Sequence, residues 1–125
     1  MPVEAAALDP RASVVLTEAI RRIAQFWDLS NAGLGAIIGV SAPTASRLRA
    51  GRWTVDPGGK PFELAQLMLR LFRSLDSFFG GDDSAARWWL DQPNRDLGGR
   101  PRELIATVSG LVAVSDYVDA IRARV

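Results

Sequence analysis

The sequence contains no histidine and no cysteine among its 125 residues. Without histidine it lacks the commonest general base and the commonest zinc ligand, and a histidine-based catalytic triad is excluded. Without cysteine it can form no disulfide framework, which fits a reducing compartment. Its most apolar window, 104–114, is too short to cross a bilayer, and its start lacks the pattern of a secretory signal. We therefore expect a cytoplasmic protein that contacts no membrane, holds no metal or cofactor, and is not an enzyme.

Apolar residues make up 48% of the chain, and this length is sufficient for a packed core. They recur at helical spacing and do not alternate over the length of a strand, which predicts an all-α protein. The expected helices cover 13–28, two short segments within 29–53, 61–79, a short segment ending at Leu90, 101 to a break at Gly110, and 111–124. The expected organisation is a loose arm over 1–12, a helix-turn-helix bundle over 13–58, a long central helix over 59–80 and a small helical domain over 81–125.

The first long helix is expected to have Ser13 as its N-cap. Its apolar residues, three and four positions apart, predict one buried stripe. The residues expected in this stripe are Val15, Ala19, Ile20, Ile23 and either Phe26 or Trp27. The helix would serve as the scaffold behind the two shorter helices that follow it.

The stretch from Leu29 to Trp53 has the pattern of two short helices joined by a tight turn, as in DNA-reading helix-turn-helix units. Gly39 stands at the turn, where a positive φ is favoured, and Ser41 is a good N-cap for the second helix. Gly35 costs roughly 1 kcal/mol of helix propensity relative to alanine, which predicts a lightly packed unit. The apolar residues expected inside are Leu34, Ile38, Val40, Ala45 and Leu48.

The outward side of the second short helix carries small and polar residues and guanidinium groups, which can approach a groove and address base edges and phosphates. The positive charge is concentrated here, because 41–60 contains four basic residues against Asp56 alone, whereas 61–125 contains eight basic and nine acidic residues. The alternative is an ordinary helical hairpin with solvated arginines. The expected DNA-binding residues are Ser41, Ala42, Thr44, Ser46, Arg47, Arg49 and Arg52.

The central helix is apolar on more than one side. One stripe contains Leu64, Leu67, Met68, Leu71, Leu75 and Phe78, and a second, rotated stripe contains Phe62, Ala65, Leu69, Phe72 and Phe79. A helix covered by apolar residues all round is buried all round. We expect the first stripe to face the core of the chain and the second to bind another copy, with Phe62, Leu69, Phe72 and Phe79 as dimerisation residues. The alternative is a central helix buried entirely within one chain.

Past Gly80-Gly81, a short helix is expected to be capped by Asp82, Asp83 or Ser84, which explains the acidic pair better than an acid–base role does. It ends in Trp88-Trp89-Leu90, and Pro93-Asn94 must then leave the helix because the residue before proline avoids the α region. Asn94 favours a local hydrogen bond from side chain to backbone. The two indoles are expected to anchor this turn-rich loop as a structural corner.

Residues 78–125 closely resemble the toxin-binding domain of Xre/MbcA/ParS-type antitoxins, and the first half generically resembles a Cro/Xre-like DNA-binding domain. The resemblance depends on Trp88 or Trp89, Pro93-Asn94, Leu97-Gly98-Gly99 with Pro101, Gly110, and the ending Tyr117-Val118-Asp119-Ala120-Ile121-Arg122. It implies an antitoxin that neutralises a NAD-consuming RES-domain toxin by occluding its active site. It also implies autorepression through double-stranded operator DNA, as a homodimer or a higher hetero-oligomer with the toxin.

In this family the C-terminal end of the antitoxin lies near the NAD cleft of the toxin. Carried onto this chain, the resemblance implies toxin-binding roles for Tyr117, Arg122, Arg124 and Val125. An arginine or a terminal carboxylate in that cleft would act as a competitive plug through charge-assisted hydrogen bonds. The alternative is an exposed basic helix end that complements the helix dipole.

Two other functions remain open at this point. One is a helix-turn-helix repressor that senses a small ligand through its C-terminal half and has no toxin partner. The other is a localisation or scaffold protein that uses the same C-terminal module. A toxin gene beside this one would favour the antitoxin, whereas thermal stabilisation by metabolites would favour the ligand-responsive repressor.

Overall fold

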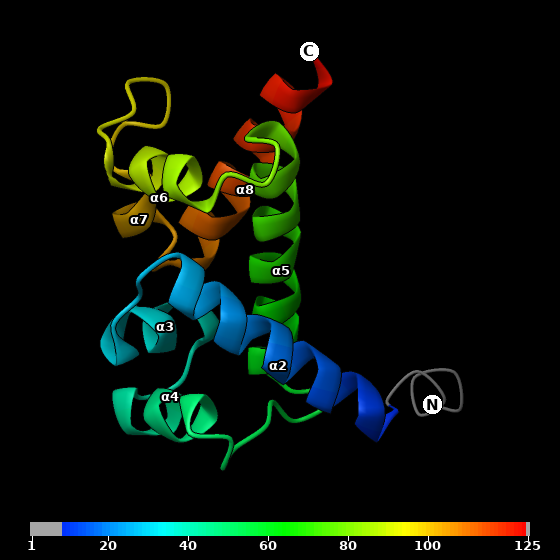
Figure 1. Cartoon of the computed structure of the whole chain (residues 1–125). Coiled ribbons are helices and arrows are strands. Elements are labelled where there is room, and N and C mark those ends of the chain that lie inside the picture. The colour runs from blue at the N-terminus through cyan, green and yellow to red at the C-terminus, as the bar shows by residue number, and fades with distance from the viewer. Residues whose placement is uncertain (1–8, 125) are drawn as a thin grey trace.

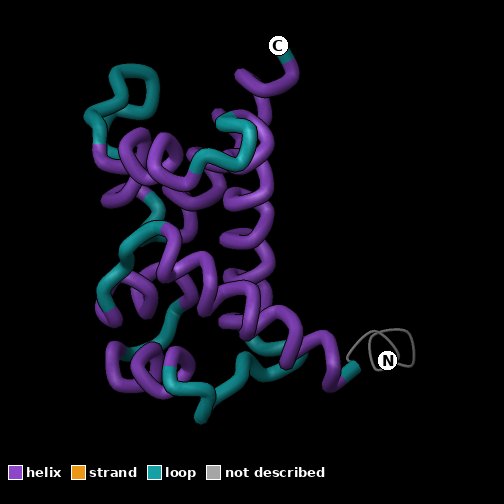
Figure 2. Tube along the Cα trace, in the orientation of Figure 1, coloured by secondary structure: helices purple, strands orange, loops and turns teal. Residues whose placement is uncertain are grey.

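The computed structural model describes residues 9–124. Within this range the chain forms seven helices joined by turns, with no strand and one isolated bridge between Asn94 and Gly99 (Figures 1 and 2). The helices are α2 (Pro10–Phe26), α3 (Asn31–Ile38), α4 (Ala42–Arg49), α5 (Lys60–Phe78), α6 (Asp83–Asp91), α7 (Pro101–Leu104) and α8 (Val108–Ala123). The predicted all-α class is therefore confirmed, with an N-terminal helix-turn-helix part, a long helix and a C-terminal helical part in the expected order.

Helix α2 begins three residues earlier than the expected start at Ser13. The Asp9 side chain accepts a hydrogen bond of 2.9 Å from the backbone N–H of Arg11, and Pro10 stands in the first turn, where its missing N–H costs nothing. Residues 10–12 are thus helical, whereas the remainder of the expected arm, 1–8, lies outside the described residues. Ser13 is buried inside the helix and is not its cap.

The buried stripe of α2 also differs from the expected one. Val15 is 68% exposed, whereas Leu16 is buried. The stripe is rotated because the polar residues Ser13 and Thr17 face inward, where both contact Val55 in the loop before α5. The Ser13 hydroxyl donates to the carbonyl of Val55, and the Val55 N–H donates to Thr17 Oγ1 at 3.0 Å. These bonds clamp the loop onto α2, and apolar spacing alone gives no sign of them.

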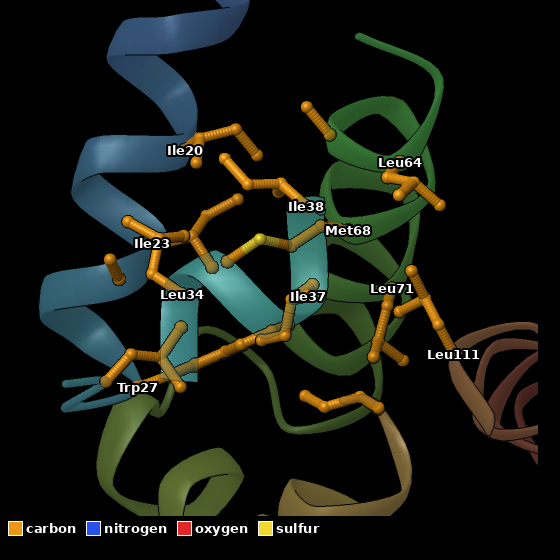
Figure 3. Packing of buried hydrophobic residues seen from close by; sticks show 14 of the residues in the cluster. Ile20, Ile23, Trp27, Leu34, Ile37, Ile38, Leu64, Met68, Leu71 and Leu111 are labelled. Carbon is orange, nitrogen blue, oxygen red and sulfur yellow. The ribbon is translucent and has the colours of Figure 1, made fainter. Parts of the chain in front are cut away.

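Helix α5 is the axis of the fold and begins and ends within one residue of the expected 61–79. Its N-terminal half packs against α2 and α3, and its C-terminal half packs against α8 (Figure 1). Met68 lies among Ile20, Ile38 and Leu34, and Leu71 points toward Leu111 of α8 (Figure 3). One continuous hydrophobic cluster therefore joins the N-terminal and C-terminal parts of the chain.

The connection between α7 and α8 corrects the expected break at Gly110. Helix α7 ends at Leu104, and the Thr107 side chain caps α8 by accepting a hydrogen bond of 3.1 Å from the Gly110 N–H. Gly110 is therefore in the first turn of α8. A Cβ atom there would collide with the carbonyl oxygen of Leu104, so this glycine permits close approach of two segments and does not break a helix.

The two indoles of α6 have different environments. Trp89 stacks on Tyr117 of α8, with ring centroids 6.4 Å apart and planes 16° apart. Trp88 is 64% exposed, so the expectation that both indoles anchor the following loop is wrong for this residue. Trp88 projects away from the core because the buried positions of α6, Ala86 and Leu90, lie on the opposite side of the helix. The loop itself closes as expected, with Asn94 Oδ1 accepting from the Leu97 N–H at 3.0 Å.

Candidate nucleic-acid interface and C-terminal surface

The turn between α3 and α4 is built around two glycines. Gly39 has φ 77°, in the left-handed region that the sequence predicted for this position, and it ends α3. Gly35 lies directly against the turn, since a Cβ atom there would collide with the Val40 carbonyl oxygen. The expectation of a lightly packed unit is therefore wrong, because the missing side chain lets α3 pack directly against the backbone of the turn at Val40 and Ser41. Leu34, Ile38, Ala45 and Leu48 are fully buried.

The outward surface of α4 is accessible to a large ligand. Ser41 caps the helix by accepting a hydrogen bond of 3.2 Å from the Thr44 N–H, as predicted. Ala42, Ser46 and Arg47 are exposed, and the Arg47 guanidinium donates to Thr44 Oγ1 at 2.9 Å. Helix α4 lies at the end of the molecule opposite the C-terminus (Figure 1). A double helix could therefore approach it without contacting the C-terminal part.

Two of the expected DNA-binding arginines differ in what they contact. Arg49 is half-buried, and its guanidinium donates to the Leu29 carbonyl at 2.6 Å, linking the end of α4 to the start of the helix-turn-helix stretch. It therefore supports the position of α4 from within the protein. Arg52 is exposed just past α4, and no ion pair to its guanidinium occurs in residues 9–124.

The four expected dimerisation residues on α5 do not share one surface. Phe72 stacks on Phe26, with ring centroids 5.8 Å apart, and its ring centroid lies 6.2 Å from that of Trp27. It therefore packs against the interior of the chain. Phe79 is half-buried and meets Phe78 edge-on at 5.0 Å. Phe78, expected in the core stripe, is 38% exposed because α5 ends there. Phe62 and Leu69 are half-buried and line a groove between α2 and α5.

The expected toxin-binding residues at the end of α8 differ in exposure and in what they contact. Tyr117 is stacked on Trp89, and its hydroxyl donates to Asp96 at 3.0 Å, which ties α8 to the loop before α7. Arg122 and Arg124 are exposed, and only Arg122 has an ion pair in the described part of the chain, to Asp119 at 3.6 Å. Val125 lies outside the described residues.

A polar cluster fixes the C-terminal half of α8 to α5. Asp119 accepts a hydrogen bond of 2.5 Å from the Ser74 hydroxyl and one of 2.6 Å from the Arg70 guanidinium. The Ser74 hydroxyl and the Arg70 guanidinium together hold the pKa of the Asp119 carboxyl below its usual value, because both favour the ionised form over partial burial. The cluster sets the direction in which α8 carries Arg122 and Arg124.

We expect Asp119→Asn to remove about 1 kcal/mol or less from the free energy of unfolding at pH 7, since the ion pair is partly exposed. A carboxyl with a lowered pKa in the folded state stabilises the fold above its unfolded pKa of about 3.9, and this contribution is lost as the pH falls through the lower folded value. The difference between wild type and variant in denaturant titrations should therefore begin to shrink below pH about 4 and vanish only at lower pH, once the folded carboxyl is protonated. Asp116→Asn, whose carboxylate is more exposed and lies 3.6 Å from Arg70, is the matched control. A difference that stays constant down to pH 3 would contradict the assignment.

One contact between the two halves of the chain was missed by sequence reasoning. The Arg87 guanidinium of α6 donates to the carbonyl of Phe26 at 2.9 Å, capping the last turn of α2. These residues are 61 positions apart, and nothing in the local pattern around Arg87 distinguishes it from a solvated arginine. The partner of such a side chain depends on tertiary structure alone.

A tight glycine turn, a capped second helix with buried Ala45 and Leu48, and an accessible polar side define a helix-turn-helix DNA-binding protein. Residues 6–73, more than half of the chain, match the antitoxin Xre-like helix-turn-helix domain, and residues 74–124 match the antitoxin Xre/MbcA/ParS C-terminal toxin-binding domain. The chain belongs to the Xre-type antitoxin family. No curated protein matches it. The C-terminal toxin-binding domain implies a toxin as a partner, and the helix-turn-helix domain implies DNA.

The two matched domains meet between residues 73 and 74, inside α5. The long helix thus belongs to both, which agrees with the continuous core around it. No helix within residues 9–124 is long and apolar enough to cross a membrane.

Proposed function

We propose that this chain is the antitoxin of a type II toxin–antitoxin pair whose toxin is a NAD-consuming RES-domain enzyme. The observation that carries the proposal is the presence, in one chain, of an accessible α4 and a C-terminal toxin-binding domain at opposite ends of the fold. The chain itself has no catalytic role in this proposal. It works in the cytoplasm, where its operator and its toxin are found.

The first activity is repression of its own operon. Helix α4 enters the major groove, with Ser41, Ala42 and Ser46 near the bases and Arg47 addressing a base edge. Arg47 is exposed, and its guanidinium donates to the neighbouring Thr44, a bond that it can exchange for one to DNA. Arg52 contacts the phosphate backbone. We remove Arg49 from the proposed base contacts, since its guanidinium supports the Leu29 carbonyl.

We expect Arg47→Ala to weaken binding to the promoter region of its own gene by about 1–3 kcal/mol and to relax specificity, because one base contact is lost. Arg52→Ala should instead weaken binding to all duplexes alike and reduce the salt slope by about 1, because one phosphate contact is lost. Fluorescence anisotropy at several salt concentrations measures both effects. Arg95→Ala, which removes an exposed charge from the loop before α7, is the control. Unchanged affinity and salt slope in both α4-region variants would overturn the assignment.

The second activity is neutralisation of the toxin. Arg124 and Arg122 project from the end of α8, whose direction is fixed by the bonds of Asp119 to Ser74 and Arg70. A guanidinium placed in a cleft that binds a dinucleotide donates charge-assisted hydrogen bonds to carboxylate or carbonyl oxygens of the cleft. The antitoxin then competes with NAD for the cleft. Tyr117 supports this contact indirectly, because its hydroxyl bond to Asp96 holds α8 in position.

A further inference from the structure

A hollow of about 370 Å³ lies between α5 and α8 and is bordered by three arginines. Arg70 and Arg73 come from successive turns of α5, and Arg122 comes from the last turn of α8. Asp119 is the one carboxylate among the described residues that line it, so the walls have a surplus of positive charge. The volume falls within the range of small-ligand pockets, about 300–1,000 Å³. The other lining residues are Gln66, Leu69 and Ser74.

Asp119 holds two of the three guanidiniums in place without using all of their donors. Its Oδ2 accepts a hydrogen bond of 2.6 Å from Arg70, and its Oδ1 lies 3.6 Å from a terminal nitrogen of Arg122. The Ser74 hydroxyl fixes the carboxylate by donating to Oδ1 at 2.5 Å, and Asp116, outside the hollow, lies 3.6 Å from Arg70. A guanidinium has five N–H donors in a planar fork. Both arginines therefore keep donors for a second acceptor.

Arg73 is the arginine that this cluster leaves without a carboxylate. It is exposed, and no ion pair to its guanidinium occurs in residues 9–124. A cation beside two other cations is stabilised when an anion binds among them. Guanidiniums bind phosphate through paired N–H···O bonds, and a phosphate group offers three strong acceptor oxygens. The hollow therefore has the donors and the charge that a phosphate group requires.

A more apolar hollow, of about 270 Å³ between α2 and α5, adjoins the first one. The two hollows share Gln66, Leu69 and Arg73. A molecule whose phosphate lies among the arginines can therefore place an attached ring against the apolar side chains of the second hollow, Phe62 included. The remaining residues that line the second hollow are all apolar and are Ala12, Val15, Leu16, Ala19 and Phe62.

We propose that the two adjoining hollows bind a small phosphate-bearing molecule of the nucleotide class, with its phosphate held by Arg70, Arg73 and Arg122 and its base in the apolar hollow. The site is separate from the proposed DNA surface, because none of the described residues that line either hollow belongs to α3 or α4. The inference goes beyond the proposed antitoxin function and does not depend on it. Arg122 has a place in both, so it is left unchanged in the tests.

The first test separates the two parts of the ligand by isothermal titration calorimetry of the full chain with AMP, ribose 5-phosphate, inorganic phosphate and adenosine. We expect AMP to bind about tenfold more tightly than ribose 5-phosphate, since its base buries apolar surface. Adenosine should show no binding at concentrations that saturate with AMP, because it lacks the group that the arginines hold. AMP binding should weaken as NaCl is added. Adenosine binding as tight as that of AMP, or no binding of any of the three phosphates at millimolar concentrations, would overturn the proposal.

The second test uses variants at exposed positions, whose melting temperatures without ligand should match that of the wild type. Arg73→Ala should weaken AMP and ribose 5-phosphate alike by about tenfold or more, since charge-assisted hydrogen bonds are lost. Val15→Ser, at a residue that is 68% exposed, should weaken AMP about threefold and leave ribose 5-phosphate unchanged, because it makes only the apolar hollow more polar.

Arg95→Ala is the matched control, because it removes an exposed arginine that lines neither hollow. Both affinities should stay at the wild-type value in this variant. An equal loss of affinity in Arg73→Ala and Arg95→Ala would show that only the overall charge matters and would overturn the site. A weaker binding of ribose 5-phosphate in Val15→Ser, equal to that of AMP, would overturn the placement of the base.

Discussion

Gly35→Ala is expected to lower the free energy of unfolding by about 3 kcal/mol, at the upper end of the range for overpacking. The added Cβ would collide with the Val40 carbonyl oxygen and come within 3.3 Å of the Ser41 backbone. Both are backbone atoms of the turn, so they cannot move aside as a flexible side chain can, and α3 must separate from α4. Urea denaturation followed by circular dichroism measures the change.

Gly33→Ala is the matched control, because it lies in the same helix one half-turn away. Its Cβ would meet the Ser30 hydroxyl at 3.2 Å and no backbone atom outside its own helix within 4 Å. Alanine is the better helix former by about 1 kcal/mol, so this variant should be as stable as the wild type or slightly more so. Equal stability of Gly35→Ala and Gly33→Ala would show that the turn is not packed as described.

Deletion of residues 121–125 is expected to abolish protection when the chain is co-expressed with its toxin, with colony counts falling by several orders of magnitude. The deletion removes Arg122 and Arg124 but leaves Asp119 and its bonds to Ser74 and Arg70 in place. Binding to the promoter duplex should therefore persist at near wild-type affinity. Full protection by the truncated chain would refute the proposed plug, although not the complex itself.

Arg124→Glu tests the charge of Arg124 without shortening the chain. Arg124 is exposed and has no ion pair within residues 9–124, so the reversal should leave stability unchanged. It should weaken protection against the toxin, because the hydrogen bonds that the guanidinium donates to the toxin are lost. Arg95→Glu makes the same change in an exposed loop of the same domain. Loss of protection with Arg95→Glu alone would place the toxin contact at the loop before α7 and not at the end of α8.

Both matched domains share one hydrophobic core, which is continuous around α5. Because one hydrophobic cluster includes residues from Leu16 to Val118, a core substitution in either part is expected to lower the stability of the whole chain. Surface substitutions such as Arg47→Ala and Arg124→Glu are therefore the changes that separate the two activities. Arg95→Ala and Arg95→Glu, at an exposed loop residue, are the controls for these two changes.

Sequence reasoning predicted the features that depend on residues a few positions apart. Ser41 as a cap, Gly39 at a positive φ, the start of α5 near Pro61 and the bond from Asn94 to its own loop are all local, and all are confirmed. The combined order of motifs in the second half also identified the family. Such signals are readable because each is satisfied within a turn or two of the chain.

Tertiary structure alone decided which partner each remaining side chain found. It placed Phe72 against Phe26, turned Arg49 back to Leu29 and joined Arg87 to the end of α2. Apolar periodicity indicates that a helix has a buried side, but it does not indicate which element covers that side. The spacing of arginines does not indicate whether a carbonyl from another helix lies within reach of a guanidinium. The sequence by itself therefore determined the class of protein, the long helix α5 and the cap of α4, but not the start of α2 or of α8. The packing of α2, α5 and α8 determined which surfaces remain available, because those contacts join residues that are far apart along the chain.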